Sequence, residues 1–240
     1  MRFGCRCEIE QMTDLADAGY EYAEMSTAAL YPALDDEAFR HARHELLGEP
    51  LFPEVIRWPE LVAWAGDSGR DLRTLFRRAA LNGCKTIVAA MPSLETPLGL
   101  GHPTTAWREA TEVVGVLGEH AARVRVKLAL EAAAGGTVEE AWVLAEEAGH
   151  AAVGVAMDLS QVNDLADIAA AEALLMHVSL PAPRRHGGDL DSTQCMDALE
   201  HLVQFGYRGR VTITTPWEAI RETADELLDE MKRLTSTGGA

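Results

Sequence analysis

Two acidic side chains end apolar, strand-like segments in the middle of this 240-residue chain. Glu131 follows the run KLAL at 127–130, and Asp158 ends the run VGVAMD at 153–158. A carboxylate in an apolar run is costly to bury unless it has a partner. Carboxylates at neighbouring strand ends can hold a divalent cation or act as an acid and a base. The pair therefore predicts catalytic or metal-binding chemistry, with helix capping as the alternative for Asp158.

Five further residues near predicted strand ends are candidates for contact with a ligand: Glu24, Gln161, His177, Arg185 and Trp217. His177 shares a strand face with Ser179, although a single strand histidine is more often a hydrogen-bonded core residue than a ligand. Arg185 lies in the loop after that strand and either holds an anionic or polyhydroxy ligand or faces solvent. Trp217 follows the last strand, in a position to wall a pocket.

The elements that must position these residues alternate between strand and helix. Strands are predicted over 2–8, 22–26, 50–57, 85–91, 125–131, 153–158, 175–180 and 210–215. Helices are predicted over 12–18, 35–47, 71–81, 104–122, 138–149, 164–174, 192–205 and 217–234. Apolar strands separated by helix-length segments are typical of βαβ units with a parallel sheet.

Eight such units predict a single (β/α)8 TIM-barrel domain over residues 1–240, for which about 250 residues is a typical length. An open doubly wound sheet is the competing fold, but the turn after the first strand, EIEQMTD at 8–14, has no glycine-rich phosphate loop. In a barrel, chemistry takes place where the strands end. We therefore expect Glu131 and Asp158 to face each other across one rim of a closed cylinder.

Charge and composition limit the partners. The chain has 21 Lys and Arg against 38 Asp and Glu, a formal charge of −17, which disfavours nucleic acid and anionic lipid. No apolar run approaches the roughly 20 residues of a membrane span. Four cysteines without a CxxC pair predict neither a disulfide framework nor a structural zinc site, and no secretory leader pattern is present. We expect a reduced, cytoplasmic protein that binds neither nucleic acid nor membranes.

Six short motifs occur in a characteristic order: GYEYAE at 19–24, ALNGCKTIV at 80–88, LALE at 128–131, VGVAMD at 153–158, HVSL at 177–180 with RHG at 185–187, and FGYRGRV at 205–211. Together they resemble the xylose isomerase-like TIM barrels, which include sugar-phosphate isomerases and ketose 3-epimerases. The resemblance extends over nearly the whole chain. Each motif is weak alone, and their order and spacing make the match moderately specific.

The resemblance implies one divalent cation (Mn, Mg, Co or Zn) held by Glu, Asp, His and Glu. These ligands fall on Glu131, Asp158, Ser179 and Thr215, so only the first two are retained. Ser and Thr hydroxyls are poor ligands for a transition metal, which predicts weak or absent metal-dependent proton transfer unless Glu24, His177 or His186 supply ligands. The substrate-contacting histidine of the family falls on Gln161, whereas its substrate arginine is retained as Arg185.

The function implied is that of a sugar or sugar-phosphate isomerase or epimerase, with a small carbohydrate as substrate and a homodimer as one expected assembly. Glu131 is then the base, and Asp158 the second proton-transfer group. The alternative is a non-catalytic family member that binds a small polyol or a partner protein, suggested by Ser179 and Thr215. A metal-dependent endonuclease or hydrolase on the same barrel is a weaker third reading, because the charge of −17 opposes DNA binding.

Overall fold

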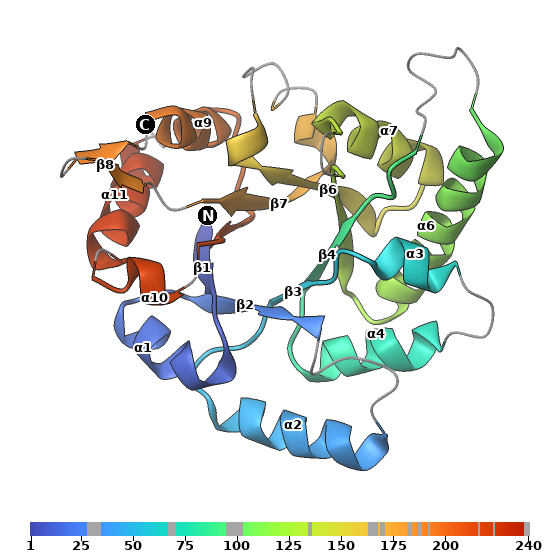
Figure 1. Cartoon of the computed structure of the whole chain (residues 1–240), viewed down its shortest axis with the longest axis horizontal. Coiled ribbons are helices and arrows are strands. Elements are labelled where there is room, and N and C mark those ends of the chain that lie inside the picture. Colours follow the sequence, from blue (N-terminus) through green and yellow to red (C-terminus); the bar gives the residue numbers. More distant parts are fainter. Residues whose placement is uncertain are drawn as a thin grey trace.

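Eight parallel strands form a closed barrel in the order β1-β10-β7-β6-β5-β4-β3-β2, and helices surround it (Figure 1). The computed structural model describes residues 1–27, 35–66, 71–94, 103–133, 136–162, 168, 171–181, 184–186, 189–191, 193–215, 217–222 and 224–237. The predicted (β/α)8 TIM-barrel fold is confirmed.

The barrel strands are β1 (Arg2–Arg6), β2 (Tyr22–Ser26), β3 (Val55–Arg57), β4 (Thr86–Ala90), β5 (Lys127–Glu131), β6 (Val153–Asp158), β7 (Leu175–Leu180) and β10 (Arg210–Ile213). Three of them, β2, β6 and β7, have the predicted bounds. The strand predicted over 50–57 is shorter than expected and starts after Pro53. A proline lacks the N–H that a ladder needs, which accounts for the late start.

The helices are α1 (Met12–Asp17), α2 (Asp36–Gly48), α3 (Leu61–Ala65), α4 (Leu72–Leu81), α6 (Thr105–Arg123), α7 (Val138–Ala148), α9 (Thr193–Gln204), α10 (Trp217–Ile220) and α11 (Ala224–Thr237). Capping side chains set several starts: Asp35, Asp71, Thr104 and Thr137 each accept a backbone N–H three residues on. The short α3 was not predicted, and the helix expected over 217–234 is divided into α10 and α11.

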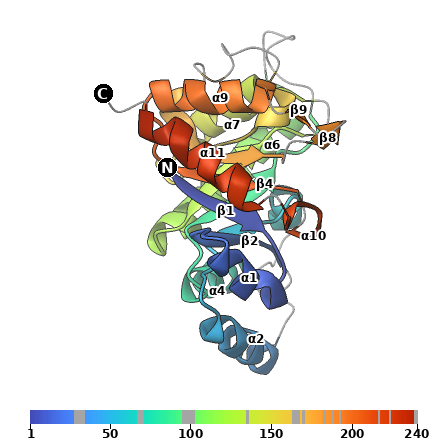
Figure 2. The ribbon, with the colours of Figure 1, turned by 90° about the vertical axis from the view of Figure 1, so that its left-hand side faces the viewer.

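The connections within the described residues include three 3-10 turns: η1 (Ile9–Gln11), η3 (Leu159–Gln161) and η4 (Glu172–Leu174). The helix predicted over 164–174 lies mostly outside the described residues, and its last three positions form η4. Where a loop was expected after β7, β8 (Arg184–His186) and β9 (Asp189–Asp191) pair as an antiparallel hairpin. Figure 2 shows this hairpin on the same side of the barrel as α10, which follows the carboxyl end of β10.

Apolar side chains fill the middle of the barrel, separately from the larger core between strands and helices. This inner cluster consists of Tyr22, Val55, Val88, Ala129 and Ala156. Two residues further along four of these strands come Glu24, Arg57, Glu131 and Asp158. Because side chains in a strand alternate between faces, these four face inward at the carboxyl end of the barrel, called the mouth below.

A separate charged network lies at the amino end of the barrel. Glu54 accepts hydrogen bonds at 2.6 Å from both Arg2 and Arg210. Beside it, the hydroxyls of Tyr22 and Thr212 lie 3.0 Å apart and are fully buried. Side chains paired with one another therefore occupy this end, as is expected for the stabilising face of a barrel.

Candidate functional site

Glu24 is the most deeply buried carboxylate at the mouth, with no exposed side-chain surface. Its Oε1 accepts hydrogen bonds from Arg6 Nη2 at 2.8 Å and from Arg57 Nε at 3.0 Å. His177 Nε2 lies 3.4 Å from the other oxygen, Oε2. Burial alone would raise the pKa of Glu24, but His177 and the two guanidinium groups outweigh it and hold that pKa well below its ordinary value. Glu24 is therefore an ionised anchor for the cations around it.

Arg57 extends from the end of β3 across the mouth to β5 and β7. Its Nη1 donates to Glu131 Oε2 at 2.5 Å, and its Nη2 donates to Glu131 Oε1 at 3.1 Å. The same Nη2 donates to Ser179 Oγ at 2.8 Å. A two-pronged guanidinium–carboxylate pair is strong and fixes the geometry of both partners. Together with its bond to Glu24 on β2, Arg57 thus joins the ends of four strands through a single planar group.

Asp158 caps the turn that follows its own strand. Its Oδ1 accepts the backbone N–H of Ser160 at 2.9 Å and the Ser160 hydroxyl at 2.7 Å, at the start of η3. In the strand register Glu131 lies beside Ala156, and Asp158 lies beside Ser179. The two predicted carboxylates therefore lie at the same end of adjacent strands, but Glu131 is paired with Arg57 and Asp158 with the backbone.

The other predicted site residues are more dispersed. His177 and Ser179 are fully buried on β7, with Ser179 level with Asp158 in the strand register. Trp217 is buried in the helical layer and packs edge-on against Tyr20, with ring centroids 6.2 Å apart. The backbones of Gln161 and Arg185 lie in η3 and β8, while their side chains are outside the described part of the structure.

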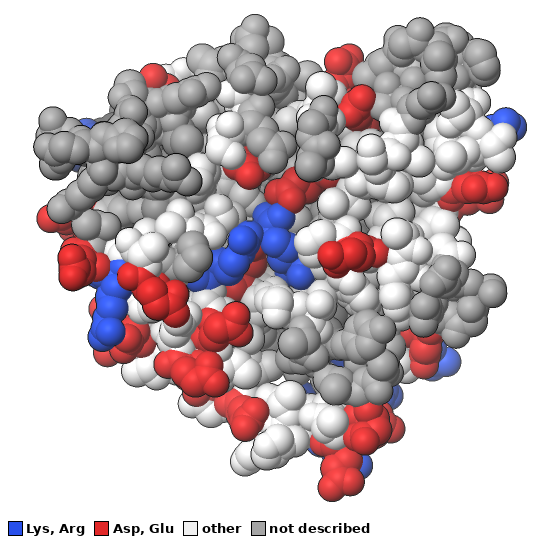
Figure 3. Space-filling model, in the orientation of Figure 1, with Lys and Arg blue, Asp and Glu red and all other residues white. Residues whose placement is uncertain are grey.

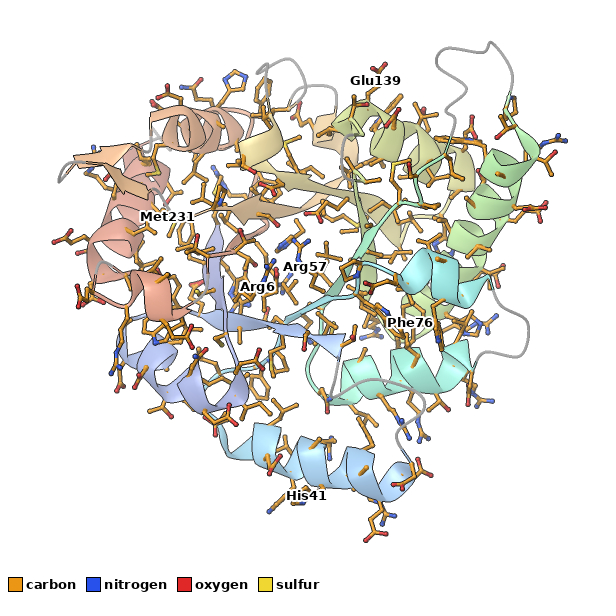
Figure 4. The ribbon with its side chains drawn as sticks, viewed as in Figure 1. Arg6, His41, Arg57, Phe76, Glu139 and Met231 are labelled. Atoms are coloured by element: carbon orange, nitrogen blue, oxygen red, sulfur yellow. The ribbon has the colours of Figure 1, made fainter. Side chains whose placement is uncertain are left out.

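Sequence reasoning missed Arg6 and Arg57. Arg57 ends the strand predicted over 50–57, so the strand-end rule that selected Glu131 and Asp158 also applied to it. Arg6 faces inward because it lies two residues after Gly4, where an added Cβ would point at the Tyr22 ring inside the barrel. Figure 4 shows Arg6 and Arg57 together at the centre of the ring of helices, whereas the labelled Glu139 lies at the periphery.

The mouth differs in charge from the surrounding molecular surface. Figure 3 shows Lys and Arg atoms at the centre, flanked by Asp and Glu atoms. The side chains of Arg57 and Glu131 are 16% and 14% exposed, so both reach the surface only partly. A polar solute in the mouth would meet guanidinium and carboxylate groups in surroundings where electrostatic contacts are stronger than in water.

The donor set does not fit the four-ligand divalent site implied by the family resemblance. Among the residues that the structure describes, no cluster of three or more His, Cys, Asp or Glu is arranged to hold a metal ion. Glu131 and Ser179, two of the four ligand positions, are both engaged by the Arg57 guanidinium. Ser179 offers only a neutral hydroxyl, and the fourth position is Thr215.

A closed (β/α)8 barrel with a cluster of charged residues at the carboxyl ends of its strands places the chain in the general class of TIM-barrel proteins. The model of the xylose isomerase-like TIM barrel family matches residues 12–237, and the chain belongs to this family. No curated protein sequence matches the chain. Among the described residues, no helix is long and apolar enough to cross a membrane.

Solved structures show the same fold at low sequence identity. D-psicose 3-epimerase with D-tagatose from Clostridium cellulolyticum H10 is 16% identical, with a TM-score of 0.67 over 99% of this chain and 96% of that one. A xylose isomerase domain protein from Planctomyces limnophilus is 14% identical, with a TM-score of 0.71 over 98% of each chain. A xylose isomerase-like protein from Mycobacterium smegmatis in complex with magnesium is 18% identical, with a TM-score of 0.65 over 95% of this chain and 89% of that one.

Proposed function

We propose that the mouth binds a small sugar or sugar phosphate and that the protein isomerises or epimerises it by proton transfer next to the carbonyl. The observation that carries this proposal is the position of Glu131, which faces inward at the mouth, is partly exposed and is held in place by Arg57. Family membership and the epimerase among the similar structures support a carbohydrate as the ligand.

The proposed reaction uses Glu131 as the base. Its carboxylate removes a proton from the carbon beside the carbonyl. The electron pair of that C–H bond forms a carbon–carbon double bond, and the π pair of the C=O bond moves to the oxygen, giving an enediolate. Return of a proton to the opposite face of the same carbon yields the epimer. Return to the neighbouring carbon, with the hydroxyl proton passing to the former carbonyl oxygen, yields the isomer. Asp158, at the end of the adjacent strand, is the second proton-transfer group.

One observation favours the alternative of a non-catalytic polyol binder. Glu131 is paired through both oxygens with Arg57, and Asp158 Oδ1 accepts two hydrogen bonds from Ser160. A carboxylate oxygen that already accepts hydrogen bonds is less available to take a proton from a ligand. Catalysis then requires the ligand to loosen the Arg57–Glu131 pair, whereas a binder can leave it intact.

Exchange of carbon-bound hydrogen distinguishes the two functions. The purified protein is incubated in D2O with a panel of ketohexoses and pentulose phosphates, with and without Mn²⁺, and deuterium at the carbons flanking the carbonyl is followed by NMR. We expect exchange by the parent and a loss of about 10²-fold or more in Glu131→Gln, with Glu139→Gln on the exposed face of α7 as the unaffected control. Binding without exchange would support the non-catalytic alternative. An equally active Glu131→Gln variant would exclude Glu131 as the base.

A further inference from the structure

The guanidinium of Arg57 is surrounded by oxygen atoms from three strands. Glu24 on β2, Glu131 on β5 and Ser179 on β7 supply four acceptors at 2.5–3.1 Å. Two of these three residues, Glu131 and Ser179, are positions where the family resemblance places metal ligands. The centre of the mouth is therefore a site for a cation, and a side chain of the protein itself fills it.

Charge balance explains why this place needs a cation. Glu24 has no exposed side-chain surface and Glu131 only 14%, so two negative charges approach one another away from solvent. An isolated ionised carboxylate in such surroundings is very costly. Burial also opposes the charge on Arg57, but the two carboxylates outweigh it and hold the pKa of Arg57 above its ordinary value. The Arg57 guanidinium is therefore positively charged in the folded protein.

The guanidinium retains capacity for a ligand. An arginine has five N–H donors, and the described residues account for four: the Nε–H, both hydrogens of Nη2 and one hydrogen of Nη1. The remaining Nη1 hydrogen belongs to the atom that holds Glu131, the proposed base. A ligand oxygen bound by this hydrogen would thus lie next to the carboxylate that is proposed to remove the proton.

We propose that Arg57 takes the place of the divalent cation at the mouth, so that the protein binds the carbonyl or enediolate oxygen of its ligand through a guanidinium group and without a metal. The identity of the ligand rests on the proposed function, whereas the replacement of the metal does not. In the reaction, negative charge that develops on the ligand oxygen is stabilised by the fixed N–H of Arg57, and no electron or proton passes to the guanidinium.

The first experiment, on the parent protein, tests the claim that the mouth holds no metal ion. The chain is purified without chelator, its content of Mn, Mg, Co and Zn is measured, and its melting temperature is recorded with EDTA and with each ion. We expect less than about 0.1 ion per chain and no change in melting temperature, since a ligand that binds only the folded state must stabilise it. A stoichiometric ion whose removal lowers the melting temperature would overturn the proposal, whether or not a sugar binds.

The Arg57→Ala variant tests whether the centre of the mouth binds a cation once the guanidinium is removed. We expect this variant to gain about 3 °C or more in melting temperature with millimolar guanidinium chloride or Mn²⁺, and the parent and the exposed-arginine control Arg77→Ala to gain nothing. No gain from either cation would contradict the proposal. If Arg57→Ala does not fold, Arg57→Lys retains the charge, and the measurements on the parent remain decisive.

The claim that the Arg57 guanidinium binds a ligand oxygen is tested with the sugar that binds most tightly in the exchange panel. We expect the parent to have the same Kd with and without EDTA, and Arg57→Lys to bind about 10-fold or more weakly, because an ammonium lacks the planar pair of donors. A Kd that rises 10-fold in EDTA would contradict the proposal. If no sugar binds the parent while the metal tests succeed, the proposed function fails and the replacement of the metal stands.

Discussion

Arg57 Nε donates a hydrogen bond to Glu24 Oε1 across 3.0 Å, between the ends of two neighbouring strands. This bond links a carboxylate without solvent exposure to a guanidinium that also holds Glu131 and Ser179. Stability and the proposed ligand binding therefore depend on the same group of side chains. A change at either end of the Arg57–Glu24 bond should affect both properties.

Replacing Glu24 with Gln should destabilise the protein strongly. The variant leaves Arg57 largely buried with one carboxylate fewer, and breaking a buried ion pair typically costs about 3–5 kcal/mol. The free energy of unfolding, measured in urea, should fall by about 3 kcal/mol. The control is Glu21→Gln, which removes a pair with Arg2 in which both side chains are about 40% exposed and should cost no more than about 1 kcal/mol. Equal effects from the two variants would contradict the assigned role of Glu24.

Stability should also fall in acid because of Glu24. In the unfolded chain this carboxyl takes up a proton near its ordinary pKa of 4.5, whereas in the folded protein its pKa is lowered. Below about pH 4.5 the unfolded state therefore binds more protons than the folded state, and the free energy of unfolding decreases with falling pH. The decrease between pH 5 and pH 3 should be steeper for the parent than for Glu24→Gln. Parallel curves would show that Glu24 titrates normally in the folded state.

Gly154 should tolerate no side chain, because β6 and β7 approach closely there. A Cβ at this position would meet the backbone carbonyl oxygen of Leu174 and would lie 2.7 Å from Met176 Cγ. We expect Gly154→Ala to lower the free energy of unfolding by about 1–3 kcal/mol, as overpacking does. The matched control is Gly48→Ala at the end of α2, where an added Cβ would meet no atom within 4 Å beyond its chain neighbours and its own helix backbone, and the effect should be within about 1 kcal/mol. A neutral Gly154→Ala would mean that the two strands can separate.

Variants of Asp158 can separate its capping role from a role in the reaction. Asp158→Asn retains an oxygen for the Ser160 N–H and should keep the melting temperature, whereas Asp158→Ala should cost about 0.5–2 kcal/mol of stability. If Asp158 transfers a proton, Asp158→Asn should slow exchange of carbon-bound hydrogen at an unchanged melting temperature. Unchanged exchange in Asp158→Asn would leave the residue as a cap only.

The strands were predictable because their signal is local. Apolar runs bounded by turn residues predicted β2, β6 and β7 with the bounds that the structure has. Alternation then determines which residues face inward, so Glu24, Glu131 and Asp158 could be assigned to one end of the barrel. Short elements were less predictable: β3 has only three residues, and α3 and the β8–β9 hairpin lack a periodic pattern long enough to recognise.

The order of strands and helices, and the eight units that predict a barrel, follow from residue types and short-range periodicity. The loss of two ligand positions follows from the resemblance of the sequence motifs to those of the family. The contacts of Arg57 could not be predicted from the sequence. Glu131 and Ser179 are 74 and 122 residues away from it and become its neighbours only when the barrel closes. A flexible arginine could equally have faced solvent. Only the tertiary structure directs its guanidinium across the mouth, where buried carboxylates require a positive charge.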